Sequence, residues 1–220
     1  MKEIIDGIIN PSLYENSKYK IMWILKEGNV SSDEREDEIN LLTGFSSGHH
    51  KITNNAISIP TFRKMIYATY GILNPDIEWS DVPYANADAY EAIQHVAYIN
   101  INKYPGGAVS NYNSIKQAYI KNKQVLLKQI KDCNPNIIIF GGTWSYFETE
   151  DLRSIGWDIS SSETKYVDDS HIGTTTTYLT VSPTKVCINA YHPAYPRIAD
   201  KAYWYELKTA VKKWEQETNN

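Results

Sequence analysis

The chain has 220 residues and a net charge of -4, with 42% apolar and 22% charged residues. No stretch approaches the roughly 20 apolar residues of a membrane helix. The negative net charge argues against a protein that binds nucleic acid mainly through its overall electrostatic field. The N-terminus lacks the cationic start and long apolar region of a secretory signal. We therefore expect a cytoplasmic protein without a membrane partner. We also expect a monomer.

Four apolar runs predict the strands of one sheet. They are 20–25, 95–100, 136–140 and 185–189, and the segment 175–181 is predicted to form a hairpin with the last. Near-continuous rather than alternating apolar character indicates strands that are buried on both faces, as in parallel sheets covered by helices. We predict a single domain over residues 1–220 with an α/β fold: a three-layer α/β/α sandwich around a central, mainly parallel four-stranded sheet.

Apolar residues at helical spacing predict the helices between these strands. One follows Pro60, and another begins near Ser114, where Gln117 would complete a capping box. A helix that ends before Asn134-Pro135 and is followed at once by a strand is typical of a right-handed crossover. The irregular composition of residues 31–60 predicts a loop or an insertion.

Polar or glycine-rich residues follow each predicted strand. Glu27 and Gly28 follow the first, Asn100 ends the second, a glycine pair follows the third, and His192 follows the fourth. The carboxyl ends of parallel strands meet at one edge of a sheet and gather ligands there. A carboxylate can activate water, an amide can donate and accept, and a histidine can stabilise negative charge. This pattern predicts a site for a planar polar ligand, although each residue alone is also typical of a turn or cap.

The loop after the last predicted strand reads Tyr191-His192-Pro193-Ala194-Tyr195-Pro196-Arg197. Its two prolines fix φ and remove backbone donors, which stiffens the loop and holds the histidine in a set place. His192 is therefore the best single candidate for chemistry. The alternative is a turn histidine that bonds a neighbouring backbone group.

In their order along the chain these motifs resemble the uracil-DNA glycosylase superfamily, especially its thermophilic iron–sulfur branch. Residues 98–106 resemble that branch's YITNVVKCRPPG motif, with one residue fewer before Asn100. Residues 135–141 resemble its P-x-x-I-x-x-x-G motif, and His192-Pro193 followed by Arg197 resembles its last motif. The resemblance implies the uracil-DNA glycosylase-like fold and hydrolysis of the N-glycosidic bond of a flipped uracil or other damaged base, in base-excision DNA repair.

The same resemblance implies roles for residues of the base pocket. Asn100 would read the edge of the uracil, and His192 would face the base carbonyl as negative charge builds on the leaving base. Glu27 takes the position of a water-activating residue. Gly28 and one of the aromatic residues Phe45 and Phe62 would complete the pocket.

The resemblance also implies residues that contact DNA, either single- or double-stranded. Lys103 and Arg197 would contact phosphates. Tyr195 and Pro196 lie where the family places groups that enter the DNA beside the lesion. The partner implied by the resemblance is therefore DNA, or a nucleotide or base.

The chain departs from the family in its first motif. Leu25-Lys26-Glu27-Gly28-Asn29 stands where the family has GEAPG, GINPG or GQDPYH, so the proline and second glycine are missing. The isolated Cys133 and Cys187 predict core residues rather than cluster ligands, and we expect neither a cofactor nor a metal. Two alternatives stay open: a catalytically altered or inactive member of the fold that binds a nucleotide, base or nucleic acid, and an unrelated small-molecule hydrolase that uses Glu27 and His192.

Overall fold

The computed structural model describes residues 3–28, 39–40, 42, 45, 58–106, 110–167 and 176–219. Most of segment 31–60, predicted to be a loop or an insertion, lies outside these residues. Its part Ile39–Asn40 forms β4, which pairs in parallel with β1 (Ile4–Ile5). Across the described parts of the chain, no helix is both long and apolar enough to cross a bilayer. Cys133 and Cys187 are buried free thiols, as predicted for core residues.

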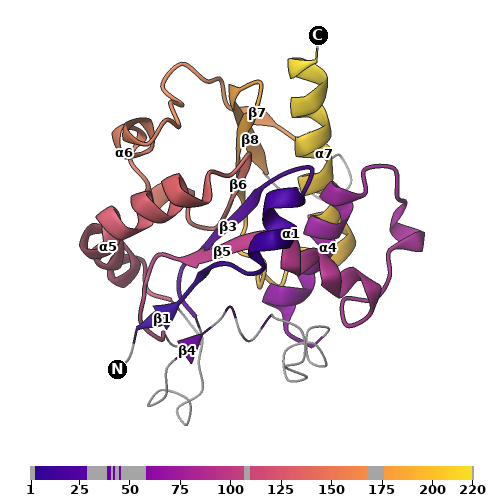
Figure 1. Cartoon of the computed structure of the whole chain (residues 1–220), viewed down its shortest axis with the longest axis horizontal. Helices are drawn as coiled ribbons and strands as arrows, with labels where there is room; N and C mark the ends of the chain where they lie inside the picture. The colour runs from indigo at the N-terminus through magenta and orange to yellow at the C-terminus, as the bar shows by residue number, and fades with distance from the viewer. Residues whose placement is uncertain are drawn as a thin grey trace.

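Within the described residues, seven strands form one mixed sheet in the order β2-β5-β3-β6-β9-β8-β7 (Figure 1). In that order the strands are Gly7–Ile8, Val96–Asn100, Ile21–Leu25, Ile137–Gly141, Lys185–Ala190, Thr177–Ser182 and Lys165–Tyr166. The four strands from β5 to β9 run parallel, whereas β2, β8 and β7 pair antiparallel.

The prediction of a four-stranded sheet is therefore wrong in extent, although the α/β class is confirmed. The four predicted strands lie side by side, and antiparallel strands extend the sheet on both sides. β2 and β7 have two residues each, too few to show the period that identifies a strand in a sequence.

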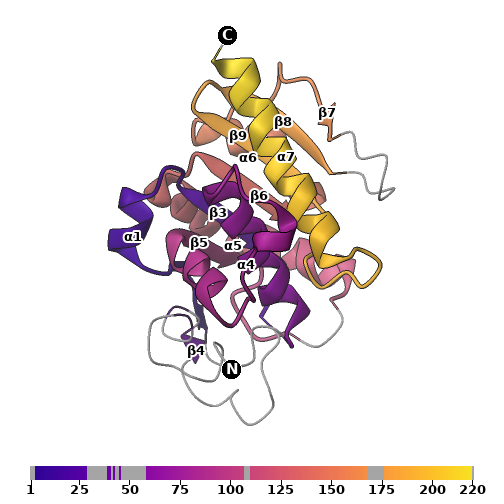
Figure 2. The same cartoon turned by 90° about the vertical axis from the view of Figure 1, so that its right-hand side faces the viewer.

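Helices cover both faces of the sheet (Figures 1 and 2). One face carries α4 and α7, and the other carries α5 and α6. The helices are α1 (Pro11–Asn16), α4 (Pro60–Leu73), α5 (Tyr112–Cys133), α6 (Thr149–Ser154) and α7 (Asp200–Thr218), with 3₁₀ helices at Trp79–Asp81, Asp88–His95 and Trp144–Tyr146.

Strand β3 shows how the two faces are filled. Its side chains alternate between two apolar clusters, because successive residues of a strand point to opposite faces. Trp23 packs into the cluster beneath α4 and α7, whereas Met22 and Ile24 pack into the cluster beneath α5. Burial on both faces explains the near-continuous apolar run.

Helix α5 starts earlier than its sequence predicts. Asn111 is the N-cap, and its Oδ1 accepts hydrogen bonds from the backbone N–H groups of Asn113 and Ser114, so the predicted capping box at Ser114 is wrong. At the other end Asn134 adopts φ 44°, a left-handed conformation that asparagine tolerates. Pro135 then stops the helix, as predicted, and β6 follows directly.

Candidate functional site

The carboxyl ends of the four parallel strands meet at one edge, as the sequence predicted. Asn100 lies opposite Leu25 in the neighbouring strand, and Gly141 lies opposite Ala190. β3 and β6 are in register between them, with Ile24 opposite Phe140. At about 4.8 Å per strand, this row places the ends of β5 and β9 roughly 14 Å apart. The row thus carries Asn100 at one end, and the loop of His192 follows the strand at the other end.

His192 follows β9 and is half-buried. The backbone N–H of Ala194 donates to its Nδ1 at 3.1 Å, so the neutral ring carries its proton on Nε2. Burial and the neighbouring charges of Lys26 and Lys64 lower the pKa of His192 to about 4. The predicted backbone bond of a turn histidine is thus present, and it orients a neutral imidazole whose Nε2–H is a hydrogen-bond donor.

The loop that carries His192 is tied to three elements. Gly142, with φ 70°, leaves room for it, because a Cβ at this position would lie 3.1 Å from the His192 backbone nitrogen. Lys64 of α4 donates to the Tyr195 carbonyl at 2.8 Å. The Tyr203 hydroxyl of α7 donates to the Tyr191 carbonyl at 2.8 Å. Lys64 is only 3% exposed, and its role follows from helix packing rather than from any sequence motif.

We expect His192 to remain neutral down to about pH 4, because protonation would bury a cation beside two lysines. Its pKa lies below the ordinary 6.5, so the folded state binds the proton less well than the unfolded state. This contribution to stability is complete above pH 6.5 and is lost as the pH falls toward about 4. Imidazole nitrogen NMR shifts followed against pH measure the midpoint, and a midpoint near 6.5 would contradict the assignment.

Asn100 is fully buried at the end of β5. Its Oδ1 accepts from the Tyr98 hydroxyl at 3.2 Å, whereas its Nδ2 has no hydrogen-bond partner in the described structure. An unsatisfied buried donor costs about 1–3 kcal/mol, and such groups call for an explanation, a ligand among them. This unpaired donor makes Asn100 a candidate ligand-reading group, which a ligand reaches only when the groups that cover it move.

Asp6, which the sequence analysis did not identify, holds the end of β5 in place. Its carboxylate accepts from the Asn100 backbone N–H at 2.7 Å, from Lys103 Nζ at 2.8 Å and from Gln129 Nε2 at 2.9 Å. The side chains of Asp6 and Lys103 are 1% and 2% exposed. The predicted phosphate contact of Lys103 is therefore wrong, because its ammonium group is used inside the protein. From the sequence alone, a lysine that follows a strand is expected at the surface. Its burial becomes evident only when the residue that pairs with it, distant in the chain, is known.

Glu27 and Gly28 lie under the loop that follows β5. Asn102 Nδ2 donates to Glu27 Oε2 at 3.1 Å, and the Gly106 N–H donates to the Gly28 carbonyl at 2.9 Å. A Cβ on Gly106 would lie 2.1 Å from Glu27 Cδ, so only glycine permits this approach. Glu27 is at the predicted edge with its carboxylate oriented by Asn102, and the Gly28 carbonyl supports the loop.

The two aromatic residues proposed for the base pocket lie together. Phe45 is fully buried, and its ring meets Phe62 edge-on at 4.8 Å and Tyr98 at 5.9 Å. Tyr98 in turn bonds Asn100, which places Phe45 near the buried amide. Phe62 is partly buried behind it. The structure thus brings both aromatics to the Asn100 side of the edge.

Tyr195, Pro196 and Arg197 form the outer part of the His192 loop. Pro196 and Arg197 are exposed, and the half-buried Tyr195 stacks on Tyr191 with ring centroids 4.9 Å apart and planes at 10°. These residues are therefore accessible to a large ligand approaching His192.

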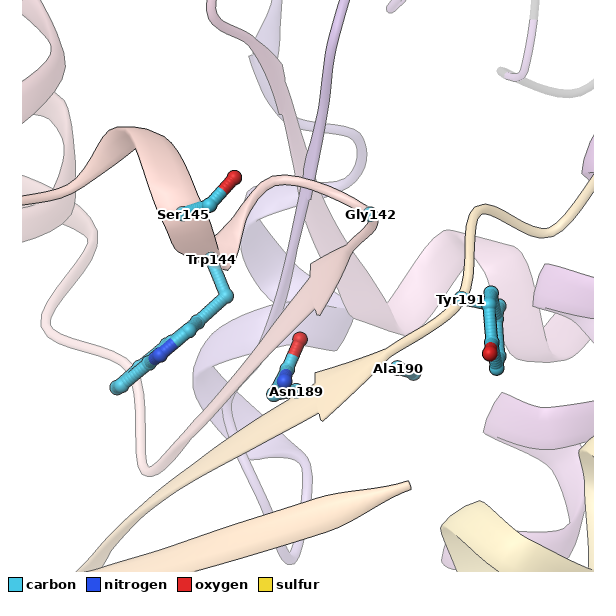
Figure 3. A pocket seen from close by; sticks show the side chains of 6 residues that line it. All are labelled: Gly142, Trp144, Ser145, Asn189, Ala190 and Tyr191. Atoms are coloured by element: carbon cyan, nitrogen blue, oxygen red, sulfur yellow. The ribbon is translucent and has the colours of Figure 1, made fainter. Parts of the chain in front are cut away.

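A cavity of about 290 Å³ opens between the ends of β6 and β9 (Figure 3). It is lined by Gly142, Trp144, Ser145, Asn189, Ala190 and Tyr191. We call it the Trp144 cavity. It adjoins His192 through Gly142 and was not predicted, although Trp144 lies two residues after Gly142, which follows β6.

The structure therefore places His192, Asn100 and Glu27 along one edge and assigns Lys103 to the interior. Arg197, Tyr195 and Pro196 lie on the outer side of the same edge. No protein-family model matches this chain, and no curated protein matches it.

Proposed function

We propose that this chain is a DNA glycosylase-like enzyme that hydrolyses the N-glycosidic bond of a flipped uracil or other damaged base. One observation carries the proposal. A buried amide with an unpaired donor, Asn100, and a neutral imidazole with a protonated Nε2, His192, lie at opposite ends of the same row of strand ends. A planar base with polar edges suits such a pair of groups.

His192 and Asn100 have different roles in the proposed hydrolysis. When water adds to C1′ and the C1′–N bond breaks, the bonding electrons leave with the base, and negative charge develops on its carbonyl oxygen. The Nε2–H of His192 stabilises this charge without prior loss of a proton. Asn100 recognises the base, because Nδ2 donates to a carbonyl while Oδ1 accepts a ring N–H on the lone pair that Tyr98 leaves free. Glu27 orients the water and takes up its proton.

The outer residues supply the contact to DNA. Arg197 is exposed beside the His192 loop, where it can neutralise a phosphate. Tyr195 and Pro196 lie on the same loop, in position to occupy the space that a flipped nucleotide leaves. This local surface supports DNA binding despite the net charge of -4.

A second function is binding of a base or nucleotide without hydrolysis. The observation that favours it is the state of Glu27, whose carboxylate is bonded to Asn102 and packed against Gly106. These contacts restrict where the carboxylate can hold a water, and binding without hydrolysis needs no such water. Asn100 and His192 would still recognise a base in that case.

A single-turnover assay separates these functions. Protein in excess is mixed with single- and double-stranded oligonucleotides that carry one deoxyuridine, and abasic sites are counted by alkaline cleavage. Release of uracil supports the glycosylase. No cleavage, together with uracil binding seen by calorimetry, refutes hydrolysis of this base and supports the binding function.

Changing Asn100 to aspartate is expected to weaken the preference for uracil over cytosine at least about tenfold, because the variant loses the Nδ2–H donor that reads the base. Competition between the two bases in the binding or excision assay measures the preference. Asn122→Asp is the matched control, since this buried amide donates to the Ile101 carbonyl at 2.9 Å and lies outside the site. An Asn100→Asp variant with unchanged preference would remove Asn100 from base recognition.

A further inference from the structure

The Trp144 cavity has the chemistry of a nucleobase site. An indole, an amide, a hydroxyl and a phenol line it, together with Gly142 and Ala190. None of these six residues is charged, so the cavity suits a neutral planar group rather than a phosphate. Its volume of about 290 Å³ lies at the small end of ligand pockets, which fits one base.

Trp144 is held as a rigid platform. Its half-buried ring meets Phe140 edge-on at 5.0 Å and 84°. The Thr143 hydroxyl donates to the Ile24 carbonyl at 2.8 Å, and the Tyr146 N–H donates to the Thr143 carbonyl at 3.1 Å. These bonds fix the turn on both sides of Trp144. An aromatic surface that is ordered in advance costs little to occupy.

The opposite wall of the cavity offers a polar group and a second ring. Asn189 rises from β9 between Trp144 and Tyr191 (Figure 3), and its Nδ2 donates to Thr177 Oγ1 at the long distance of 3.5 Å. The amide can both donate to and accept from the edge of a base. Tyr191 is 39% exposed and can stack on a ring at the mouth.

The cavity and His192 share a wall. The place of a Cβ on Gly142 is 3.1 Å from the His192 backbone nitrogen, and the backbone N–H of Gly142 donates to the Ala190 carbonyl at 2.7 Å. The cavity is therefore within reach of a base next to one that lies against His192.

We propose that the Trp144 cavity binds a base adjacent to the flipped one, which makes single-stranded DNA the substrate; this inference rests on the proposed function. In a duplex the neighbouring base is stacked and paired, and its entry would require a second unstacking. In a single strand the base is free to stack on an aromatic side chain. The net charge of -4 also disfavours a duplex more strongly than a strand of lower charge density.

Fluorescence anisotropy of a labelled single strand with one deoxyuridine tests the cavity directly. Trp144→Ala is expected to weaken binding by about fivefold to a hundredfold, and Trp144→Phe is expected to restore most of the affinity because it keeps a ring. Tyr84→Ala is the matched control, since Tyr84 is 71% exposed and does not line the cavity. An affinity of Trp144→Ala within about twofold of the unaltered protein would overturn the inference.

Single-stranded DNA with one base omitted shows which base contacts the Trp144 cavity. Omitting the base that occupies the cavity is expected to weaken binding to the unaltered protein and to leave binding to Trp144→Ala unchanged. Equal losses in both proteins at every position would overturn the inference. Because anisotropy needs no catalysis, Trp144-dependent binding without base release would refute the proposed hydrolysis alone. Base release that is unaffected by Trp144→Ala at protein concentrations below the dissociation constant would refute the cavity alone.

Discussion

Replacement of His192 by alanine is expected to lower the single-turnover rate of base release by about 10²–10³-fold, the effect of removing one fixed donor from a developing negative charge. The donor is fixed because Ala194 N–H bonds Nδ1 and leaves the proton on Nε2. It is neutral because burial and the lysines nearby lower the pKa of His192 to about 4. A neutral donor gains strength as charge builds on the base, and this gain is specific to the transition state.

The control for this variant is His95→Ala. His95 is also half-buried, and its Nδ1 shares a hydrogen bond of 2.7 Å with the Ser17 hydroxyl at the opposite end of β5. Its loss is expected to change the rate little. The pH profile adds a second readout, because the His192-dependent rate should show no inflection near pH 6.5. A His192→Ala protein that is folded and as fast as the unaltered one would exclude His192 from the chemistry.

Replacement of Asp6 by asparagine is expected to lower the free energy of unfolding by about 3–5 kcal/mol, because it leaves the buried Lys103 ammonium without a counter-charge. Both side chains are at most 2% exposed, and the Asp6 carboxylate also holds the Asn100 backbone. Urea unfolding measures the change. The loss of stability is expected to be much larger than that of an exposed ion pair.

Two further variants identify the cause. Glu150→Gln removes one of the two carboxylate partners of Arg153, in an ion pair whose side chains are 74% and 40% exposed, and it should cost less than about 1 kcal/mol. Combining Asp6→Asn with Lys103→Met removes the stranded charge and is expected to recover much of the lost stability. An Asp6→Asn protein as stable as the Glu150→Gln protein would show that the buried pair does not act as described.

Much of the fold can be predicted from local sequence patterns. The runs of β3, β5, β6 and β9 are apolar because these strands are covered on both faces, and that is visible without a structure. The parallel arrangement then places Asn100, the residues after Leu25 and the His192 loop at one edge. Short elements such as β2 and β7 carry no comparable pattern and were not predicted.

The candidate site was predicted as a set of residue types at strand ends, without their charge states or hydrogen-bond partners. Lys103 illustrates the limit: its sequence neighbourhood suggests a surface cation, but its partner Asp6 lies 97 positions away. The same holds for Asn100, whose unpaired Nδ2 is a property of its surroundings rather than of its neighbours in sequence. Charge state and hydrogen bonding depend on which groups meet in space.

The sequence by itself determined the α/β class, the places of its main strands along the chain and the edge at which His192, Asn100 and Glu27 gather, because periodicity and strand direction are local properties. Only the tertiary structure decided that Lys103 is buried, that His192 is neutral and that a cavity opens beside Trp144. Burial, pKa and cavity shape arise from contacts between segments distant in the chain, and no local pattern specifies those contacts.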